Sequence, residues 1–417
     1  MPRWLILADD LSGAADAGVA FALRGLVTEV HWRTASALDS NPPGVPAPEV
    51  IAFDTDSRRL DSPAAAQRQR EALRRLGTPG TSLFKKIDST LRGHPAAEIA
   101  AIREFCAARV IFAPANPAMG RTTRDGRVYV RGQPLELTET WQREPAHANA
   151  DPGEMLAGVG LRAAKLPLDV VRAPQRLMDA LGTGAAPQGV WICDAENDDD
   201  LVHIARAGLA APGATLFAGT AGLAQALAAQ GEARRFSPLD LRPVTTGTLV
   251  VVGSLSSISR GAAEQLSRTG RVRTVSVASE ALRGESGAGD LAQLGIRVAD
   301  LLAAGEDVLV DIAAEAQPDL ARGPELVRAL ASALEPARHV AGGLVATGGE
   351  TASALLDRWY FQRIRLIDEV APGMSLGVAV GARHLPLVTK PGGFGDAGSL
   401  VSALEALRRL RARTLKE

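Results

Sequence analysis

Residues 4–23, WLILADDLSGAADAGVAFAL, combine a short apolar run, two aspartates and a longer segment of small and apolar residues. A short apolar run bounded by polar residues is typical of a buried strand, and a longer segment of this kind is typical of a helix. We therefore expect a strand over 4–8 and a helix over 13–23, with Asp9 and Asp10 at the end of the strand.

The same order of elements continues beyond this stretch. Apolar runs at 50–53, 82–85 and 110–113 predict further strands, and the segments 63–76 and 95–107 between them predict helices. Strands that alternate with helices form a mainly parallel sheet covered by helices. The first part of the chain is therefore predicted to be an α/β domain.

A second series of strands and helices begins near residue 248 and runs to a last predicted helix that starts at residue 398. Between the two series lies a stretch with charges and prolines but no clear hydrophobic period, as expected of a linker. We predict a domain of residues 1–235, a linker of residues 236–246 and a domain of residues 247–417. Each domain should contain its own mainly parallel sheet covered by helices.

The composition suits a globular enzyme. The chain has 417 residues, 46% of them hydrophobic, and its 46 basic and 47 acidic residues give a formal net charge of −1. Nucleic acids and anionic membranes both require a basic surplus, so we expect neither as a partner. No apolar run approaches the roughly 18 residues of a membrane span. The two cysteines form neither a disulfide framework nor a cysteine metal site. We expect a cytoplasmic enzyme.

Lysine is scarce in this chain and is concentrated in particular segments. There are 5 lysines against 41 arginines, and three of the lysines are Lys85, Lys86 and Lys390. A lysine supplies a compact point charge and an arginine a planar fork, so the two are not interchangeable at a phosphate. The bias draws attention to the segments that contain these three lysines.

Charged side chains follow three strands predicted in the first domain. In an open parallel sheet, ligands bind beyond the carboxyl ends of the strands. If the side chains share one edge, the cations can hold a carboxylate, and the carboxylates can accept hydrogen bonds from hydroxyl groups. That combination suits a small polyhydroxy acid, although the same residue types also cap helices and shape turns. The residues are Asp9, Asp10, Asp54, Asp56, Arg58, Lys85, Lys86, Asp88 and Arg92.

Three loops rich in glycine or serine follow strands predicted in the second domain, at residues 253–257 (GSLSS), 347–351 (TGGET) and 391–396 (PGGFGD). Glycine lets backbone N–H groups approach a phosphate, and a helix that begins after the loop adds positive potential. One such loop is usually only a turn, but three in one domain indicate a polyphosphate. A GxGxxG pattern at 393–398 lacks the second strand and acidic ribose ligand of a dinucleotide fingerprint.

Seven segments have a familiar order and spacing along essentially the whole chain. They are ILADDLSGAADAG (6–18), KKIDSTLRGH (85–94), APANPAMGRTTRDGRVYV (113–130), GTLVVVGSLSS (247–257), VATGGETA (345–352), EVAPGM (369–374) and TKPGGFGD (389–396). Together they resemble the four-carbon acid-sugar kinase family. The resemblance implies an N-terminal domain that binds the sugar acid, a C-terminal domain that binds ATP, and an active site in the cleft between them.

The resemblance also implies the residues that contact each ligand. Expected contacts of the sugar acid are Asp10, Arg58 from the segment 57–59, Lys86, Ile87, Asp88 and Ser89, and we add Arg92 from the charged edge. Expected contacts of ATP are Ser254, Ser256, Thr347, Gly348, Gly349, Glu350, Gly392, Gly393, Phe394 and Gly395. We expect Mg²⁺ to bridge the ATP phosphates, with metal ligands that the sequence leaves unknown.

Phosphoryl transfer needs positioning and charge neutralisation more than covalent chemistry. We expect Lys86 or an arginine near the transferred group and a carboxylate that orients the accepting hydroxyl. By position Asp88 and Asp10 are the leading candidates for that carboxylate, and Asp396 is a third. The sequence does not decide among the three.

The form KKIDSTLRG at 85–93 resembles the D-threonate kinase branch of the family more than the branch that acts on 3-oxo-tetronates. It implies that ATP phosphorylates D-threonate to D-threonate 4-phosphate. Leu11-Ser12 and Ala15 depart from the common family pattern of Phe-Thr and Thr. D-erythronate, L-threonate and a 3-oxo-tetronate therefore stay open as substrates. Rivals from other classes are a sugar-acid dehydrogenase or aldolase and a non-catalytic sensor. A homodimer is compatible with the sequence, which does not determine the oligomeric state.

Overall fold

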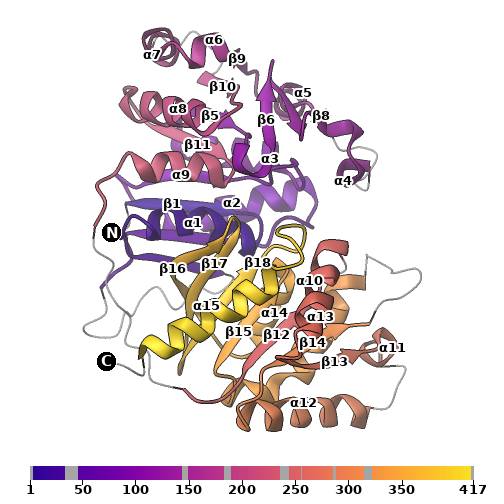
Figure 1. Ribbon diagram of the computed structural model, residues 1–417. Coiled ribbons are helices and arrows are strands. Elements are labelled where there is room, and N and C mark those ends of the chain that lie inside the picture. Colours follow the sequence, from indigo (N-terminus) through magenta and orange to yellow (C-terminus); the bar gives the residue numbers. More distant parts are fainter. Residues whose placement is uncertain are drawn as a thin grey trace. The chain divides into compact units, whose positions relative to one another are not determined.

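The computed structural model describes residues 3–32, 46–142, 149–182, 189–234, 244–254, 256–284, 288–313 and 322–414. The chain divides into two compact units, Met1–Phe236 and Ser237–Glu417, and Figure 1 shows the helices and strands of both. The division falls at the start of the predicted linker 236–246, of which residues 236–243 lie outside the described part. The units are described separately below.

The first unit contains a parallel sheet, as predicted. Its strands lie in the order β2-β3-β1-β4-β11-β5-β10-β9, and each neighbouring pair runs parallel. Their bounds are β1 Trp4–Ala8, β2 Thr28–Trp32, β3 Val50–Asp54, β4 Ser82–Lys86, β5 Arg109–Ala113, β9 Ala164–Leu166, β10 Val190–Cys193 and β11 Thr215–Gly219.

Helices cover both faces of this sheet. On one face α1 packs against α9 and α9 against α8, and on the other α2 packs against α3. Shorter helices lie around β9 and around a small antiparallel sheet of β6 Arg121–Arg124, β7 Arg127–Val130 and β8 Gln133–Pro134. The helices are α1 Leu11–Ala22, α2 Ser62–Leu76, α3 Pro95–Cys106, α4 Glu139–Gln142, α5 Pro152–Ala157, α6 Leu168–Val171, α7 Pro174–Gly182, α8 Asp198–Ala210 and α9 Ala221–Ala229.

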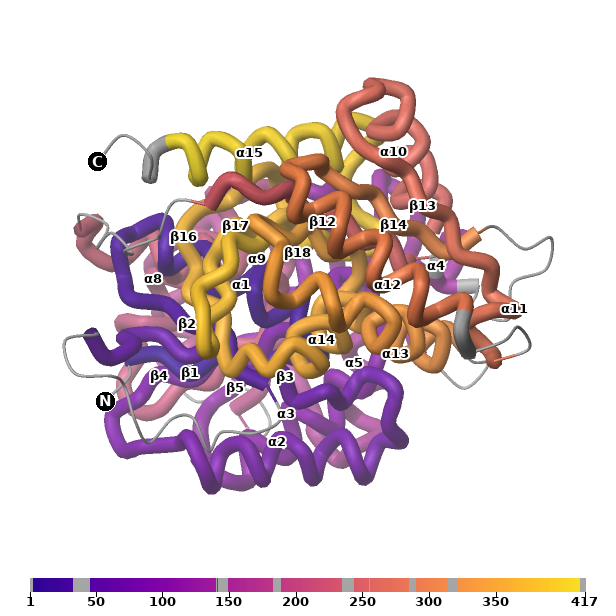
Figure 2. The backbone as a smooth tube through the Cα atoms, turned by 90° about the horizontal axis from the view of Figure 1, so that it is seen from below, coloured from indigo at the N-terminus to yellow at the C-terminus, as the bar shows by residue number. Residues whose placement is uncertain are grey.

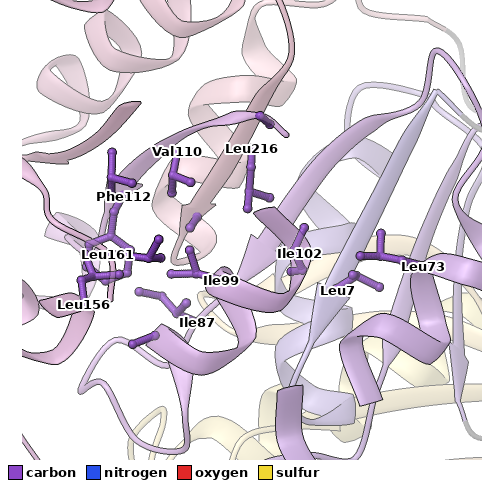
Figure 3. Packing of buried hydrophobic residues seen from close by; sticks show 14 of the residues in the cluster. Leu7, Leu73, Ile87, Ile99, Ile102, Val110, Phe112, Leu156, Leu161 and Leu216 are labelled. Atoms are coloured by element: carbon purple, nitrogen blue, oxygen red, sulfur yellow. The ribbon is translucent and has the colours of Figure 1, made fainter. Parts of the chain in front are cut away.

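The main apolar core of this unit lies between the sheet and the α2–α3 layer. Leu7 of β1 and Leu73 of α2 belong to it, together with Ile99 and Ile102 of α3 and Phe112 of β5 (Figure 3). Successive side chains of a strand point to opposite faces. Every second residue of the central strands therefore enters this core, and the residues between them face the layer of α1, α9 and α8.

Two strands of this sheet, β2 and β9, were missed in the sequence. β2 reads Thr-Glu-Val-His-Trp, and all five residues are buried. Glu29 and His31 interrupt the apolar pattern, and their side chains lie 3.1 Å apart, where they satisfy each other. Because these two polar residues can be buried as a pair, the strand contains no apolar run from which it could be predicted.

Chain order reverses within the first sheet near β1. The chain passes from β1 to β2 and β3 on one side, and α2 then carries it across to β4 on the other. In doubly wound sheets the carboxyl ends of the strands at such a reversal form the usual ligand-binding crevice. The loops after β1, β3 and β4 all end there.

The second unit is a mixed sheet that is mainly parallel, again as predicted. The strand order is β13-β14-β12-β15-β18-β17-β16. The first five strands run parallel to one another, β17 is antiparallel to β18, and β16 is antiparallel to β17. The bounds are β12 Thr248–Val252, β13 Arg273–Val277, β14 Val308–Ile312, β15 Gly343–Thr347, β16 Arg363–Ala371, β17 Met374–Val380 and β18 His384–Lys390.

Helices cover this sheet on both faces as well. α10 and α15 pack together over the buried side chains of β12, β15 and β18, and α12, α13 and α14 lie on the other side (Figure 2). The helices are α10 Ser257–Arg268, α11 Ser279–Leu282, α12 Ala288–Ala303, α13 Gly323–Ala333, α14 Gly349–Arg358 and α15 Ser399–Thr414. In the part of the chain that the structure describes, no helix is both long and apolar enough to cross a membrane.

Candidate active site

Arg58 is the centre of the charged edge in the first unit. Its Nε and Nη2 each donate to Asp9 at 2.8 Å, and Nη1 donates to Asp10 Oδ2 at 2.7 Å. Nη2 also lies 3.8 Å from Asp88 Oδ2. The guanidinium thereby joins loops that follow three different strands. The neighbouring Arg59 is exposed, so the predicted contact from this segment is Arg58.

Asp10 has a local role as well as an ionic one. Its Oδ1 accepts a hydrogen bond of 2.8 Å from Gly13 N and so caps α1. A side chain on Gly13 would place Cβ 2.6 Å from this oxygen and 3.6 Å from Lys86 Nζ. Glycine at this position therefore allows both groups to approach the start of the helix.

Asp88 is held by donors on several sides. It accepts from the Thr90 backbone and hydroxyl at 2.9 and 2.5 Å, and from Arg92 Nε and Nη2 at 3.1 and 2.6 Å. Burial alone would raise the pKa of Asp88, but the charges of Arg92 and Arg58 and these hydrogen bonds outweigh it and hold the pKa well below its ordinary value. Such a carboxylate is a poor proton acceptor, which favours a role in orienting the two arginines.

The two adjacent lysines of β4 lie on opposite faces of the sheet. Lys86 faces α1, where Nζ donates to Ile87 O at 3.0 Å and lies 3.7 Å from Asp16 Oδ2. Lys85 faces α3, and its Nζ lies 2.9 Å from Glu98 Oε2 with both side chains almost fully buried. Lys85 therefore does not line the charged edge, contrary to the expectation that both lysines would converge there.

A buried polar network lies below Arg58. Glu98 Oε1 accepts from the hydroxyl of Ser57 and, at 2.9 Å, from Gln69 Nε2. Gln69 also donates to Thr55 Oγ1 at 2.9 Å. Lys85, through Glu98, thus supports the residue that precedes Arg58. The signal for this network in the sequence was a single glutamate, Glu98, in the otherwise apolar segment PAAEIAAI (95–102).

The remaining predicted acid contacts are held by the sheet and its following loop. Ile87 is buried in the core, and its N–H donates to Gly219 O of β11 at 2.9 Å. Ser89 is buried in the same loop. Gly93, at φ +81°, leaves room for Asp9, because a Cβ there would lie 3.0 Å from Asp9 Oδ2.

Two buried aspartates at this edge were not among the predicted contacts. Burial raises the pKa of Asp16 by more than the charge of Lys86 lowers it. Burial, and after it the negative charge of Asp10, raise the pKa of Asp54 well above its ordinary value. Asp54 ends β3 and accepts from Asp56 N at 2.8 Å. A charged residue among the small residues of ADAG (15–18) was the signal for Asp16.

The pKa of Asp54 leads to a prediction about stability. The unfolded chain releases this proton near the ordinary value of 3.8, whereas the folded chain retains it to higher pH. The folded state therefore loses stability as pH rises from about 4 through the folded pKa. Asp54→Asn should raise the Tm at pH 7 and should make little difference near pH 4. The measurement is thermal unfolding between pH 4 and 8.

Asp199→Asn, at an exposed position of α8, is the matched control and should not reproduce this pH dependence. An Asp54→Asn protein that melts lower than wild type at pH 7 would contradict the prediction, because it would show that the carboxylate is stabilised as an anion.

The three glycine- and serine-containing loops of the second unit meet at the carboxyl ends of β12, β15 and β18. Gly392 O accepts from the hydroxyls of Ser256 and, at 2.7 Å, Ser259. Gly348 N donates to Lys390 O at 2.7 Å. A Cβ on Gly392 would lie 2.3 Å from Ser254 Oγ, so the loops pack tightly together.

Two helices begin at this meeting point. α10 is capped by Ser256, whose hydroxyl accepts from Ser259 N at 3.1 Å. α14 follows Gly348, which has φ +98° and caps the helix without a side chain. Helix N-termini carry partial positive charge and unpaired N–H groups, and they bind phosphate readily. The predicted contacts around Gly348, Gly392 and Ser256 are thus brought together.

The other predicted nucleotide contacts are placed differently. Thr347 is fully buried at the end of β15, and Glu350 is exposed in the first turn of α14. The ring of Phe394 packs over the β16–β17 turn, because a Cβ on Gly373 would lie only 2.4 Å from Phe394 Cδ2. Gly395 adopts φ +85°, and Gly393 has open space around it.

Strands β6 and β7 form an antiparallel hairpin, and β8 pairs with β7. Asp194 accepts from Asp125 N and Gly126 N at 2.7 and 2.9 Å, and Arg124 pairs with Glu196. These contacts favour a structural role for the turn.

Comparison with known proteins finds matches along nearly the whole chain. Residues 4–227 match the model of a sugar-binding N-terminal domain, and residues 249–400 match that of a nucleotide-binding C-terminal domain. The chain is 40% identical to a D-threonate kinase of Cupriavidus necator over 98% of this chain and 99% of the relative. It is 35% identical to a D-threonate kinase of Bordetella bronchiseptica, with 97% and 98% covered. A D-erythronate kinase of Heliobacterium modesticaldum is 27% identical, with 98% and 97% covered.

Solved structures share the fold. A Salmonella typhimurium LT2 protein superposes with a TM-score of 0.77 at 20% identity, covering 97% of this chain and 98% of that one. A Haemophilus influenzae protein superposes with a TM-score of 0.71 at 19% identity, covering 97% and 100%.

Similarity to D-threonate kinases over nearly the whole chain shows that this two-unit α/β protein is a kinase that acts on a small sugar acid. The chain belongs to the four-carbon acid-sugar kinase family. Within that family it lies in the D-threonate kinase branch.

Proposed function

We propose that this enzyme transfers the γ-phosphate of ATP to the C4 hydroxyl of D-threonate and releases D-threonate 4-phosphate. The observation that carries the proposal is similarity over nearly the full length to several D-threonate kinases, at up to 40% identity. The charged edge around Arg58 supports it independently, since the edge offers both cations for a carboxylate and acceptors for hydroxyls.

The charged edge divides its residues into binding groups and supporting groups. The side chains of Asp10, Arg58 and Arg92 are 22%, 23% and 37% exposed, so they can reach a ligand. Asp9 and Asp88 are nearly buried and orient the arginines. In this proposal Arg58 and Arg92 bind the carboxylate of the acid, and Asp10 accepts a hydrogen bond from a hydroxyl.

Among the three candidate carboxylates, we favour Asp10 as the group that orients the accepting hydroxyl. Asp88 already accepts four hydrogen bonds and has a lowered pKa. Asp396 accepts from Gly398 N and Ser399 Oγ within its own loop. Asp10 has one strong donor on each oxygen and keeps a lone pair on each. The Lys86 ammonium, close to the start of α1, adds positive charge near this hydroxyl.

The nucleotide is assigned to the loops of the second unit. Backbone N–H groups at the starts of α10 and α14 would stabilise the phosphates, together with the amides of 392–395. In this proposal the reaction proceeds when the accepting hydroxyl and the γ-phosphate are held in line. ATP is a cytoplasmic metabolite, and we propose that the enzyme acts in that compartment.

Mg²⁺ is part of the proposal. Among the described residues, no group of three or more His, Cys, Asp or Glu side chains forms a ready-made metal site. That fits Mg²⁺, which is usually held by substrate phosphates, water and one or two carboxylates. Glu350, exposed at the start of α14, is the carboxylate we assign to it. When bound, the ion neutralises phosphate charge.

Two expected outcomes test the function. With ATP, Mg²⁺ and a panel of D-threonate, L-threonate, D-erythronate and a 3-oxo-tetronate, ADP should form fastest with D-threonate, and phosphorus NMR should show a monoester at C4. Faster turnover of another tetronate would show that the enzyme is a kinase of this family with that acid as its substrate. The absence of acid-dependent ADP release would refute the kinase and favour a sensor, dehydrogenase or aldolase.

A further inference from the structure

Lys390 is a fully buried lysine at the meeting point of the three loops. It is the last residue of β18, in register with Thr347 of β15, and none of its surface is exposed. Its Nζ donates to Ser259 Oγ at 3.4 Å and to Pro391 O at 3.3 Å. Both hydrogen bonds are long, and an ammonium can donate three.

The charge of Lys390 has no close partner. In the described part of the chain, no carboxylate lies within ion-pair distance of its Nζ, and Asp396 acts on it only from further away. Lys85 is the natural comparison, because it is equally buried and has Glu98 at 2.9 Å. Burying an unpaired charge is costly, and proteins normally avoid it. An anion from outside the chain would remove the cost at Lys390.

The surroundings of Lys390 are themselves positive. Ser259, which accepts from its Nζ, lies in the first turn of α10, and the backbone of Lys390 accepts from Gly348 at the start of α14. Its carbon stem passes below the glycine loop, since a Cβ on Gly395 would lie 3.3 Å from Lys390 Cε. Two helix N-termini and an ammonium thus converge on one place.

We propose that Lys390 stabilises the phosphates of the nucleotide by supplying a positive charge beneath the loop 391–396. The inference rests on the proposed function, because it assumes that the loops hold a nucleotide. It adds that recognition depends on a buried point charge as well as on glycine amides. The contribution of Lys390 to affinity should therefore depend on the phosphates and not on the nucleoside.

The protonation of Lys390 makes this binding measurable as an uptake of protons. Burial lowers the pKa of Lys390 to about 8, and Asp396, the one described group whose charge acts on it appreciably, opposes this only in part. A bound phosphate would raise the pKa again, because an anion favours the charged amine. At pH 8 the binding of ADP should therefore take up roughly half a proton per site.

Titration calorimetry on the full chain tests the inference. Wild type should bind ADP at pH 8 with a heat that varies with the ionisation enthalpy of the buffer. Lys390→Met should weaken ADP binding roughly 10- to 150-fold, because the phosphates lose a charged partner. Adenosine should bind both proteins within about twofold, and the buffer dependence should disappear in the variant. Lys390→Arg should retain part of the affinity for ADP.

The outcomes separate the inference from the function it rests on. Equal losses for ADP and adenosine would show that Lys390 only supports the loop, and unchanged ADP binding in Lys390→Met would refute it outright. If Lys390→Met does not fold, Lys390→Gln takes its place, and unchanged ADP binding in that variant would equally refute the inference. Wild type that binds no ADP would instead refute the proposed nucleotide site.

Discussion

Arg58→Met should lower kcat/KM for D-threonate about 100- to 1000-fold, the equivalent of roughly 3–4 kcal/mol of transition-state binding. The guanidinium is shared by Asp9 and Asp10 and lies close to Asp88. Its removal takes away a cation that we assign to the substrate carboxylate. It also leaves carboxylates without the partner that compensates their burial, a change that commonly costs about 3–5 kcal/mol.

Steady-state kinetics and thermal unfolding together check this prediction. The matched control is Arg68→Met, which removes an exposed arginine from α2 and should leave both kcat/KM and Tm nearly unchanged. ADP binding by Arg58→Met should also be retained, since the nucleotide loops belong to the other unit. A variant with wild-type kinetics for D-threonate would place the anion site elsewhere in the molecule.

Gly392→Ala should raise KM for ATP about 10- to 100-fold, equivalent to roughly 1.4–2.8 kcal/mol. A Cβ at this position would lie 2.3 Å from Ser254 Oγ and 3.0 Å from Ser254 Cβ. Either the loop or the serine must move, and the two hydroxyls that hold Gly392 O would then be misplaced. Because the clash concerns the loops alone, KM for D-threonate should change little.

Gly393→Ala is the control for this variant. The neighbouring glycine has open space around its Cβ position and keeps its backbone N–H when substituted, so KM for ATP should stay within about twofold of wild type. Equal effects of the two substitutions would mean that backbone freedom, and not the close approach to Ser254, is what the loop requires. No effect of either would remove the loop from the nucleotide site.

The location of the charged edge could be predicted because it follows from local patterns. A short apolar run followed by polar residues marks the carboxyl end of a strand, and these ends meet at one edge when the strands are parallel. Asp10, Arg58 and Asp88 were found in this way. Similarly, a glycine loop between a strand and a helix is a local feature, and it led to Gly348 and Gly392.

Other parts of the site were not predictable, because they depend on contacts between distant segments. Glu98 lies in a helix that begins after the strand of Lys85, and only the packing of α3 on the sheet brings the two charges to 2.9 Å. Asp16 became part of the edge only because α1 lies over β4. The missed strand β2 was hidden because Glu29 and His31 satisfy each other.

By itself, the sequence determined two series of alternating strands and helices, the ends of their strands and the residue types at those ends. All of these follow from patterns a few residues long. Only the tertiary structure decided which of two adjacent lysines faces the charged edge and which is neutralised beneath it. It also decided that Lys390 is buried without a nearby carboxylate among the described residues. Burial and charge pairing depend on which segments pack together, and residues far apart in the chain determine that.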